Sequence, residues 1–429
     1  NVIYATGGNA SGLVTIGGSL AVDGAKAVMR ADNDAIITNN GAINAWRSSG
    51  SSPISIGMLT TDATAINNGT LNAGLFIEKN GANQNVSNAG SVGMQGSGTS
   101  TLTNNGHINV AITDTTTNNA RGINASGSTA VTNAANATIA LVGNSNNTAG
   151  KAGGYGVYLQ DSATFNNAGK IYLGVTPVLN ATAPTAVPMT GGDLSAGIHT
   201  QSSGAVNNTG IITLESKTRN AAGISVQGAT GAVTNSGTIN VLGKLTNGSA
   251  AANYGLNVVD NIGTVTHSGV INVDGDNNIA INVSAQKAAA TVSTTAGSSI
   301  TVGTAGDTGG SDGQPYTYRN YAVYAEGLNT QHAQVNLNST IRLLSAGAIG
   351  VHARGDAQID INAASTLSFE NTQQIGYYAW GDEAQINIGN AVITDSGQKD
   401  SILFAVDHGA SFAGSTGAAS TYQLTVNGQ

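Results

Sequence analysis

The chain has 429 residues, no cysteine, 59 glycines and only 9% charged residues, with a formal net charge of −8. The missing cysteines exclude disulfides and thiolate metal sites. The acidic balance argues against nucleic acid as a general partner, because phosphate binding requires a basic face. Aromatic residues make up only 4% of the chain, so we expect a narrow core of small and β-branched side chains.

One ten-residue phrase returns along the chain with small changes. In chain order it reads AIITNNGAIN from Ala35, TLTNNGHINV from Thr101, TFNNAGKIYL from Thr164, AVNNTGIITL from Ala205, AVTNSGTINV from Ala232 and TVTHSGVINV from Thr264. The outer parts alternate apolar and polar residues with period two, which predicts strands. The central Asn-Gly or Asn-Ser-Gly predicts a sharp bend, because Gly and Asn tolerate left-handed conformations. We expect stacked asparagines at these bends to hydrogen-bond along the repeat: Asn40, Asn68, Asn105, Asn167, Asn208 and Asn235.

A third short strand lies between successive copies of the phrase. Its copies are GINASGS at Gly122, GVYLQDS at Gly156, GIHTQSS at Gly197, GISVQGA at Gly223, GLNVVDN at Gly255, AVYAEGL at Ala322, GVHARGD at Gly350, GYYAWGD at Gly376 and LFAVDHG at Leu403. Three strands per period predict an all-β fold, a right-handed three-stranded parallel β-helix of the pectin-lyase-like kind. We expect a single domain, residues 1–429, of about 14 coils stacked about 4.8 Å apart.

Coil length varies mainly between the second and third strands. The insertions are Ala45–Leu59, Ala111–Ala120, Gly143–Gly153, Gly174–Asp193, Glu215–Asn220, Gly243–Asn253 and Gly303–Arg319. Insertions at one point of a solenoid repeat emerge on one edge, where binding is often placed. The candidate ligand-binding residues are Arg121, Lys151, Tyr155, Lys217, Arg219, Lys244, Tyr254, Tyr316 and Arg319. The alternative is that Lys and Arg lie in these loops only because loops are solvated.

The Asn-Asn-Gly bends, the following x-Ile-x-Val strands and the cysteine-free, Gly/Asn/Thr-rich composition resemble the passenger domains of AIDA-type adhesin autotransporters. Among these the chain is similar to the UpaB-like adhesins over essentially its whole length. The resemblance implies a bacterial cell-surface or secreted adhesin, exported through an outer-membrane barrel. It also implies host glycosaminoglycans, and fibronectin as a second partner, or self-association into aggregates and biofilm. The family supplies no binding motif that can be carried over residue by residue.

Other chemistry is weaker in the sequence. Asp407-His408 is the closest approach to a polysaccharide hydrolase, which needs two carboxyl groups at a defined separation, and we expect a turn instead. Arg354-Gly355-Asp356 occupies a predicted tight turn rather than a flexible integrin-type loop. Asp274 to Asn278 could suggest calcium but lacks the repeat of calcium-binding β-rolls. No catalytic group, metal site or cofactor is predicted.

The apolar runs and the first residues of the sequence bear on membranes and export. No apolar run approaches the ~18 residues of a membrane helix, so we expect no membrane insertion of this segment. Asn1 to Tyr4 lack the start of a signal peptide, which suggests a processed segment. The leading hypothesis is a glycan-binding adhesin. Self-association is the alternative, and a polysaccharide-cleaving enzyme is a third hypothesis.

Overall fold

The computed structural model describes residues 3–6, 11–14, 19–23, 27–46, 55–77, 84–86, 91–112, 120–143, 153–179, 183–244, 252–305, 319–328, 330–389, 391–395, 400–414 and 423–426. The chain divides into two compact units, Asn1–Ala222 and Gly223–Gln429. Strand β24 (Thr218–Gln227) contains the boundary between them.

In unit 1, apart from the short pair β10 and β11, every third strand belongs to the same parallel sheet. Sheet A contains β1 (Ile3–Thr6), β4 (Met29–Asp32), β7 (Ser55–Thr61), β12 (Ser91–Ser97), β15 (Arg121–Ala125), β18 (Tyr155–Leu159) and β21 (Met189–Thr200). Sheet B contains β2 (Ser11–Val14), β5 (Ile36–Asn39), β8 (Thr64–Asn67), β13 (Thr101–Asn104), β16 (Ala130–Asn133), β19 (Thr164–Asn167) and β22 (Val206–Asn208). Sheet C contains β3 (Ser19–Asp23), β6 (Ala42–Trp46), β9 (Thr70–Ala73), β14 (His107–Ala111), β17 (Thr138–Val142), β20 (Lys170–Val175) and β23 (Ile211–Leu214). A short antiparallel pair, β10 (Leu75–Ile77) and β11 (Gln84–Val86), branches off after β9.

Unit 2 repeats the same order of strands. Its sheet A strands are β27 (Asn253–Val259), β30 (Asn278–Ala285), β33 (Tyr321–Gly327), β36 (Ile349–Gly355), β39 (Ile375–Trp380) and β42 (Ile402–Asp407). Its sheet B strands are β25 (Val233–Asn235), β28 (Val265–His267), β31 (Ala290–Thr294), β34 (Ala333–Leu337), β37 (Ala357–Ile361), β40 (Gln385–Ile388) and β43 (Ser411–Gly414). Its sheet C strands are β26 (Thr238–Val241), β29 (Val270–Val273), β32 (Ser298–Val302), β35 (Ser339–Leu343), β38 (Thr366–Phe369), β41 (Val392–Asp395) and β44 (Gln423–Val426).

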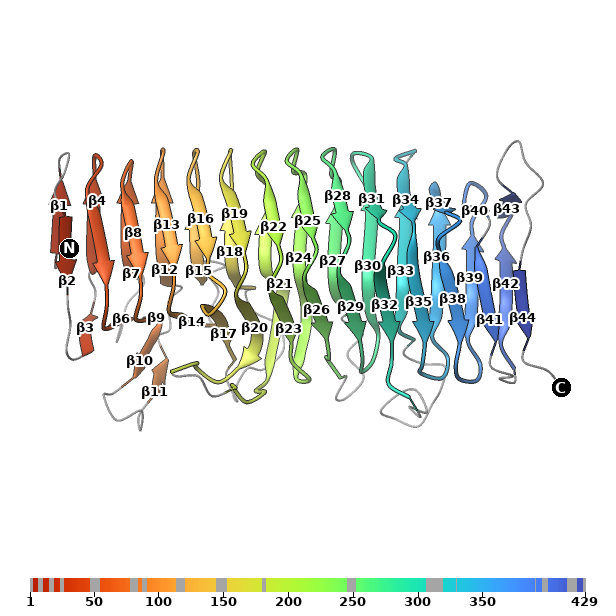
Figure 1. Ribbon diagram of the computed structural model, residues 1–429, viewed down its shortest axis with the longest axis horizontal. Helices are drawn as coiled ribbons and strands as arrows, with labels where there is room; N and C mark the ends of the chain where they lie inside the picture. The colour runs from red at the N-terminus through yellow and green to blue at the C-terminus, as the bar shows by residue number, and fades with distance from the viewer. Residues whose placement is uncertain are drawn as a thin grey trace. The chain divides into compact units, whose positions relative to one another are not determined.

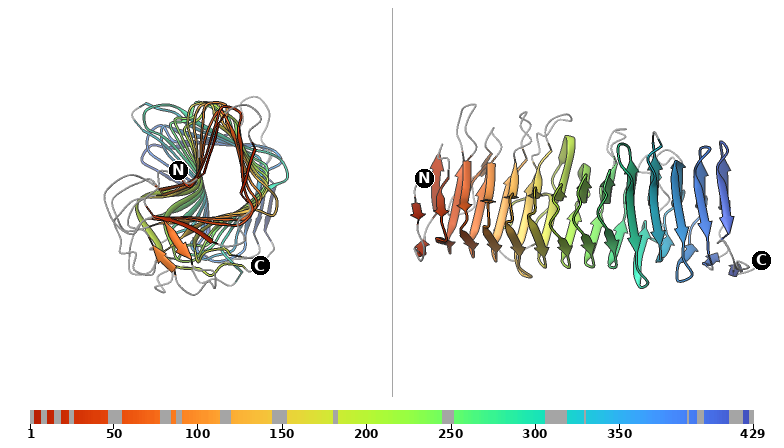
Figure 2. Two further views of the ribbon diagram at one scale, coloured as in Figure 1. Left: turned by 90° about the vertical axis from the view of Figure 1, so that its left-hand side faces the viewer. Right: turned by 90° about the horizontal axis from the view of Figure 1, so that it is seen from above.

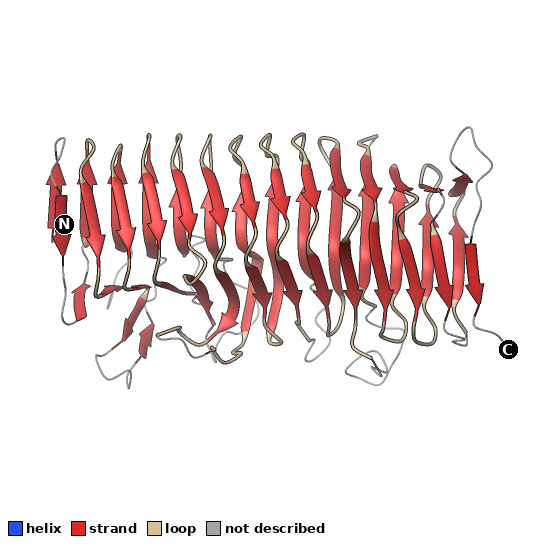
Figure 3. Cartoon of the chain, viewed as in Figure 1, coloured by secondary structure: helices blue, strands red, loops and turns tan. Residues whose placement is uncertain are grey.

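The predicted fold class is confirmed: each unit is a stretch of right-handed parallel β-helix with three sheets. Figure 3 shows no helix among the described residues, and so none that is long and apolar enough to cross a bilayer. The end-on view in Figure 2 shows the first coils of unit 1 enclosing a three-sided interior. The period-two alternation places Ile, Val and Leu inside: Ile108, Ile139 and Ile171 are fully buried at matching positions of β14, β17 and β20.

The asparagines at the bends form two rows rather than the single row that we predicted. The inner row closes the sheet B strands and is buried, and it consists of Asn39, Asn67, Asn104, Asn133, Asn167 and Asn208. The Nδ2 groups of the first five each donate to the Oδ1 atom of the next asparagine in the row over 2.6 to 2.8 Å. The outer row is exposed, with Asn105 donating to Asn68 and Asn68 to Asn40, both at 2.8 Å. Adjacent residues of one bend point to opposite sides of the chain, so the predicted set mixed members of both rows.

The two rows should differ sharply in their contribution to stability. Asn104 accepts from Asn67 and donates to Asn133 and to the Thr138 carbonyl. Asn104→Ala leaves buried amide groups without partners, and we expect a loss of about 3 kcal/mol in the free energy of unfolding. Asn68→Ala on the exposed row should cost less than about 1 kcal/mol. Urea unfolding of the two variants measures both values, and equal losses would contradict the distinction.

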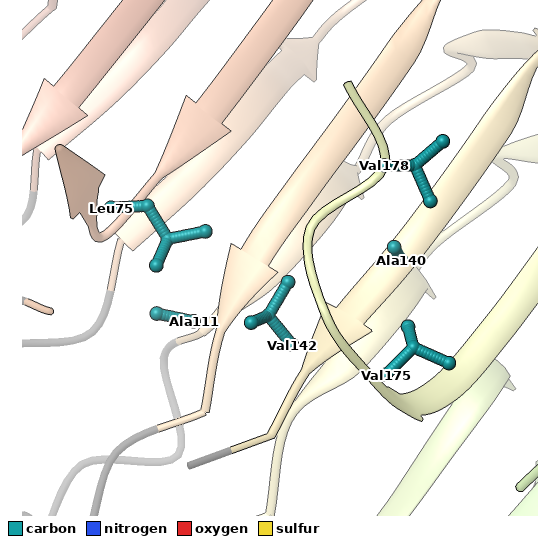
Figure 4. Packing of buried hydrophobic residues seen from close by; sticks show 6 residues of the cluster. All are labelled: Leu75, Ala111, Ala140, Val142, Val175 and Val178. Atoms are coloured by element: carbon teal, nitrogen blue, oxygen red, sulfur yellow. The ribbon is translucent and has the colours of Figure 1, made fainter. Parts of the chain in front are cut away.

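The described part of one insertion packs back onto unit 1. Val175 and Val178 join a buried cluster with Leu75, Ala111, Ala140 and Val142, which lies on sheet C and the strand that follows β9 (Figure 4). The Asn109 side chain holds this segment, since its Nδ2 donates to the Val178 carbonyl at 3.0 Å and its Oδ1 accepts from the Val178 amide at 2.8 Å. This stretch of the predicted Gly174–Asp193 loop therefore covers a sheet face.

Candidate ligand-binding site

The predicted insertions all fall at one point of the coil, between a sheet C strand and the following sheet A strand. They separate β6 from β7, β14 from β15, β17 from β18, β20 from β21, β23 from β24, β26 from β27 and β32 from β33. Much of their length, including residues 113–119, 144–152, 245–251 and 306–318, lies outside the described residues. The sheet A strands begin directly after the insertions, so their first residues lie closest to this edge.

Four side chains on adjacent sheet A strands of unit 1 form one stack, named here the unit-1 stack: Arg121, Tyr155, Tyr158 and His199. The parallel register sets Arg121 beside Tyr155 and Tyr158 beside His199. The Arg121 guanidinium lies 3.9 Å from the centroid of the Tyr158 ring. The opposite neighbour of Tyr158 is His199, whose ring is stacked at 5.2 Å and 10°. Tyr155 closes the group, with its centroid 4.8 Å from that of His199.

The unit-1 stack carries a single positive charge at neutral pH. Burial, followed by the nearby Arg121 charge, lowers the pKa of His199 to about 4, so its ring is neutral. Burial lowers the pKa of Arg121, which nevertheless stays protonated, as guanidinium groups do in proteins. Its Nη1 donates to Asn124 at 2.8 Å. Among the described residues its Nε has no hydrogen-bond partner and no carboxylate forms an ion pair with it. The stack therefore offers to an anionic ligand a guanidinium that no carboxylate of the described residues neutralises.

The structure brings together only part of the predicted site. Arg121 and Tyr155 are neighbours in the unit-1 stack. Lys217 is exposed and Arg219 is half-buried at the start of β24, next to the insertion that packs on sheet C, since the Met189 amide donates to the Lys217 carbonyl at 3.2 Å. Lys244, Tyr254 and Arg319 belong to unit 2, on separate segments. Lys151 and Tyr316 lie outside the described residues.

The charges of the chain are divided unevenly between the two units. Unit 1 has nine Lys and Arg against nine Asp and Glu, and is neutral overall. Unit 2 has six Lys and Arg residues against fourteen Asp and Glu residues, so it carries the whole net charge of −8. A polyanion is therefore repelled by unit 2 and not by unit 1 at distances within the Debye length.

Two motifs that we predicted to be turns are turns. β36 ends at Gly355 and β37 begins at Ala357, so Arg354-Gly355-Asp356 spans a tight turn. The Arg354 charge is paired with Glu326 at 3.0 Å, and the Asp356 carboxylate contacts a ring nitrogen of His332 at 2.8 Å. β42 ends at Asp407, and His408 follows with a φ of 53°.

A shallow depression in unit 2 is a weaker candidate. It measures about 420 Å³ and is lined by Asn261, Ile262, Gly263, Thr264, Val265, Thr266, Ala289, Thr291 and Ser293. Its lining has no charged or aromatic side chain to orient a glycan. The described residues also contain no group of three or more His, Asp or Glu side chains that could hold a metal ion.

Comparison with family models, with curated proteins and with solved structures found no match. The resemblance to adhesin passenger domains therefore stays an expectation from the repeat. Sequence reasoning did not select Tyr158 or His199 for the site. The sequence did contain a signal for these two residues. Each is the third residue of a third-strand copy, the one that begins at Gly156 or the one that begins at Gly197, and these copies lie in successive coils.

Proposed function

We propose that the protein is a bacterial cell-surface adhesin that binds host glycosaminoglycans through the insertion edge of unit 1. The observation that carries this proposal is the unit-1 stack, in which Arg121 keeps its charge beside three aromatic rings. The buried ring of Tyr158 holds the guanidinium in place, since Arg121 lies over one of its faces and His199 is stacked on the ring. Guanidinium groups bind sulfate and carboxylate groups in a planar, bidentate manner.

The charge distribution supports the choice of unit 1. A sulfated chain meets no net repulsion there, and Lys217 and Arg219 add cations close to the same edge. Each contact at a solvated surface contributes little, in the range of 0.2–1 kcal/mol. Affinity would then come from several contacts along one extended polymer, which raises the effective concentration of each next contact. Fibronectin is proposed as a second partner on another face, and self-association remains the alternative.

Heparin affinity tests the site with charge-matched variants. Lys217→Ala with Arg219→Ala should weaken binding about tenfold at 0.15 M NaCl, because two contacts to sulfate groups of about 0.7 kcal/mol each are lost. The slope of log Kd against log salt should also fall. The control is Lys170→Ala with Lys287→Ala, which removes the same charge at exposed positions away from the insertion edge of unit 1. Equal weakening in both variants would show binding to charge alone and would contradict the site.

Two further measurements separate the other hypotheses. Incubation with glycosaminoglycans should release no new reducing ends, whereas their appearance would favour the enzyme hypothesis. Light scattering of the purified chain should show a monomer at high concentration. Concentration-dependent oligomers without heparin binding would favour self-association.

A further inference from the structure

Unit 2 carries a second row of aromatic side chains on the outer side of sheet A, named here the unit-2 row: Tyr324, His352 and Tyr378. The register of β33, β36 and β39 aligns them in three successive coils. His352 is stacked on Tyr378 with ring centroids 4.5 Å apart, and Tyr324 contacts His352 edge-on at 5.0 Å. None of these three residues was selected from the sequence as a site.

The row ends in a step. The next position in register after Tyr378 is Ala405 of β42, which carries only a methyl group. Among the described residues Tyr378 makes a ring contact with His352 alone. One face of the Tyr378 ring therefore has no aromatic neighbour and adjoins the low surface over Ala405.

A polar border runs beside this step, two residues further along each strand. It consists of Glu326, Arg354 and Trp380, which the register also aligns. Arg354 is paired with Glu326 at 3.0 Å and lies 4.6 Å from the centroid of the Trp380 ring. Its charge is thus neutralised within the border, in contrast to Arg121 of the unit-1 stack.

The row also contains polar atoms with no partner. His352 is nine-tenths buried between its aromatic neighbours, and neither of its ring nitrogens has a hydrogen-bond partner among the described residues. A neutral imidazole offers one donor and one acceptor. Both atoms are buried inside the row, so they do not face the step beyond Tyr378.

We propose that the step at Tyr378 is a binding site for a neutral saccharide. The apolar face of a sugar ring would stack on the free face of Tyr378, over Ala405. Its hydroxyl groups would meet Trp380 and the Arg354–Glu326 pair, which supplies both donors and acceptors. An anionic glycan is disfavoured, because the unit carries a net charge of −8 and the adjacent guanidinium is already paired. The site is independent of the unit-1 stack.

Tryptophan fluorescence provides a direct test, since the chain has only Trp46 and Trp380. In a Trp46→Phe background, Trp380 emission is titrated with cellohexaose, chitohexaose and xylohexaose. We expect a saturable change with at least one of them. The fitted Kd should be the same in 0.15 M and 1 M NaCl, and heparin should not displace the sugar. No change with any of the three at millimolar concentration would overturn the proposal.

Three variants at the step complete the test. Tyr378→Ala removes the stacking face and should weaken binding at least tenfold, whereas Tyr378→Phe keeps the ring and should stay within threefold of the parent. Ala405→Tyr continues the row and covers the free face, so it should abolish binding without removing any existing contact. Thermal unfolding confirms that each variant is folded. Undiminished binding by folded Ala405→Tyr, or binding that a neutral hydrophobic peptide displaces equally well, would overturn the assignment.

Discussion

Gly122→Ala should destabilise unit 1 far more than the single added methyl group suggests. A Cβ atom at this position would lie 2.4 Å from the carbonyl oxygen of Gly156 in the next coil and 2.9 Å from Ile139. The same close approach recurs at Gly93 and at Gly156, so glycines follow one another where the backbones of sheet A approach closely. Neither the neighbouring backbone nor the close-packed core can move away freely, and we expect a loss of about 3 kcal/mol or more.

Urea unfolding of Gly122→Ala can be compared with two controls. Gly228→Ala introduces a methyl group at a φ of 61° but meets no atom within 4 Å, so it measures backbone strain without a clash. We expect Gly228→Ala to lower the free energy of unfolding by about 1 kcal/mol. Thr132→Ala on the exposed side of sheet B should be nearly neutral. A Gly122→Ala variant no less stable than Gly228→Ala would show that the close approach is not a constraint.

Acidification from pH 7 to pH 4.5 should destabilise both units through three buried histidines. Burial is the main cause that lowers the pKa of His199, His267 and His352 to about 4, against an ordinary value of 6.5. The unfolded chain therefore binds more protons than the folded chain between these values. Each histidine contributes stability that is fully present above pH 6.5 and is lost as the pH falls towards 4. For each of these histidines, complete protonation lowers the free energy of unfolding by roughly 3 kcal/mol.

Denaturant unfolding at several pH values measures this loss. His352→Gln should lower stability at pH 7 through altered packing but flatten the dependence on pH between 6.5 and 4.5. Thr132→Ala changes an exposed residue that does not titrate and should leave the slope as it is in the parent protein. If His352→Gln and the parent showed the same slope, His352 would not be held neutral by the fold.

Local patterns were enough to predict the β-helix. The strands of the phrase TLTNNGHINV show this, because alternation and an Asn-Gly bend act within a few residues. The same local signals placed the insertions between sheet C and sheet A strands. They could not separate Asn104 from Asn105, which belong to a buried and an exposed row, since that choice depends on which way the chain turns at the bend.

The candidate sites depend on contacts that the sequence alone does not contain. Arg121 and Tyr158 are 37 residues apart, and an insertion of variable length lies between them, so only the register of β15 on β18 brings them together. The step at Tyr378 likewise exists because β42 places Ala405 next in register. The sequence by itself determined the coil and its repeat through short-range chemistry. The tertiary structure decided which side chains of different coils are neighbours, because stacking aligns residues by strand pairing and not by their spacing along the chain.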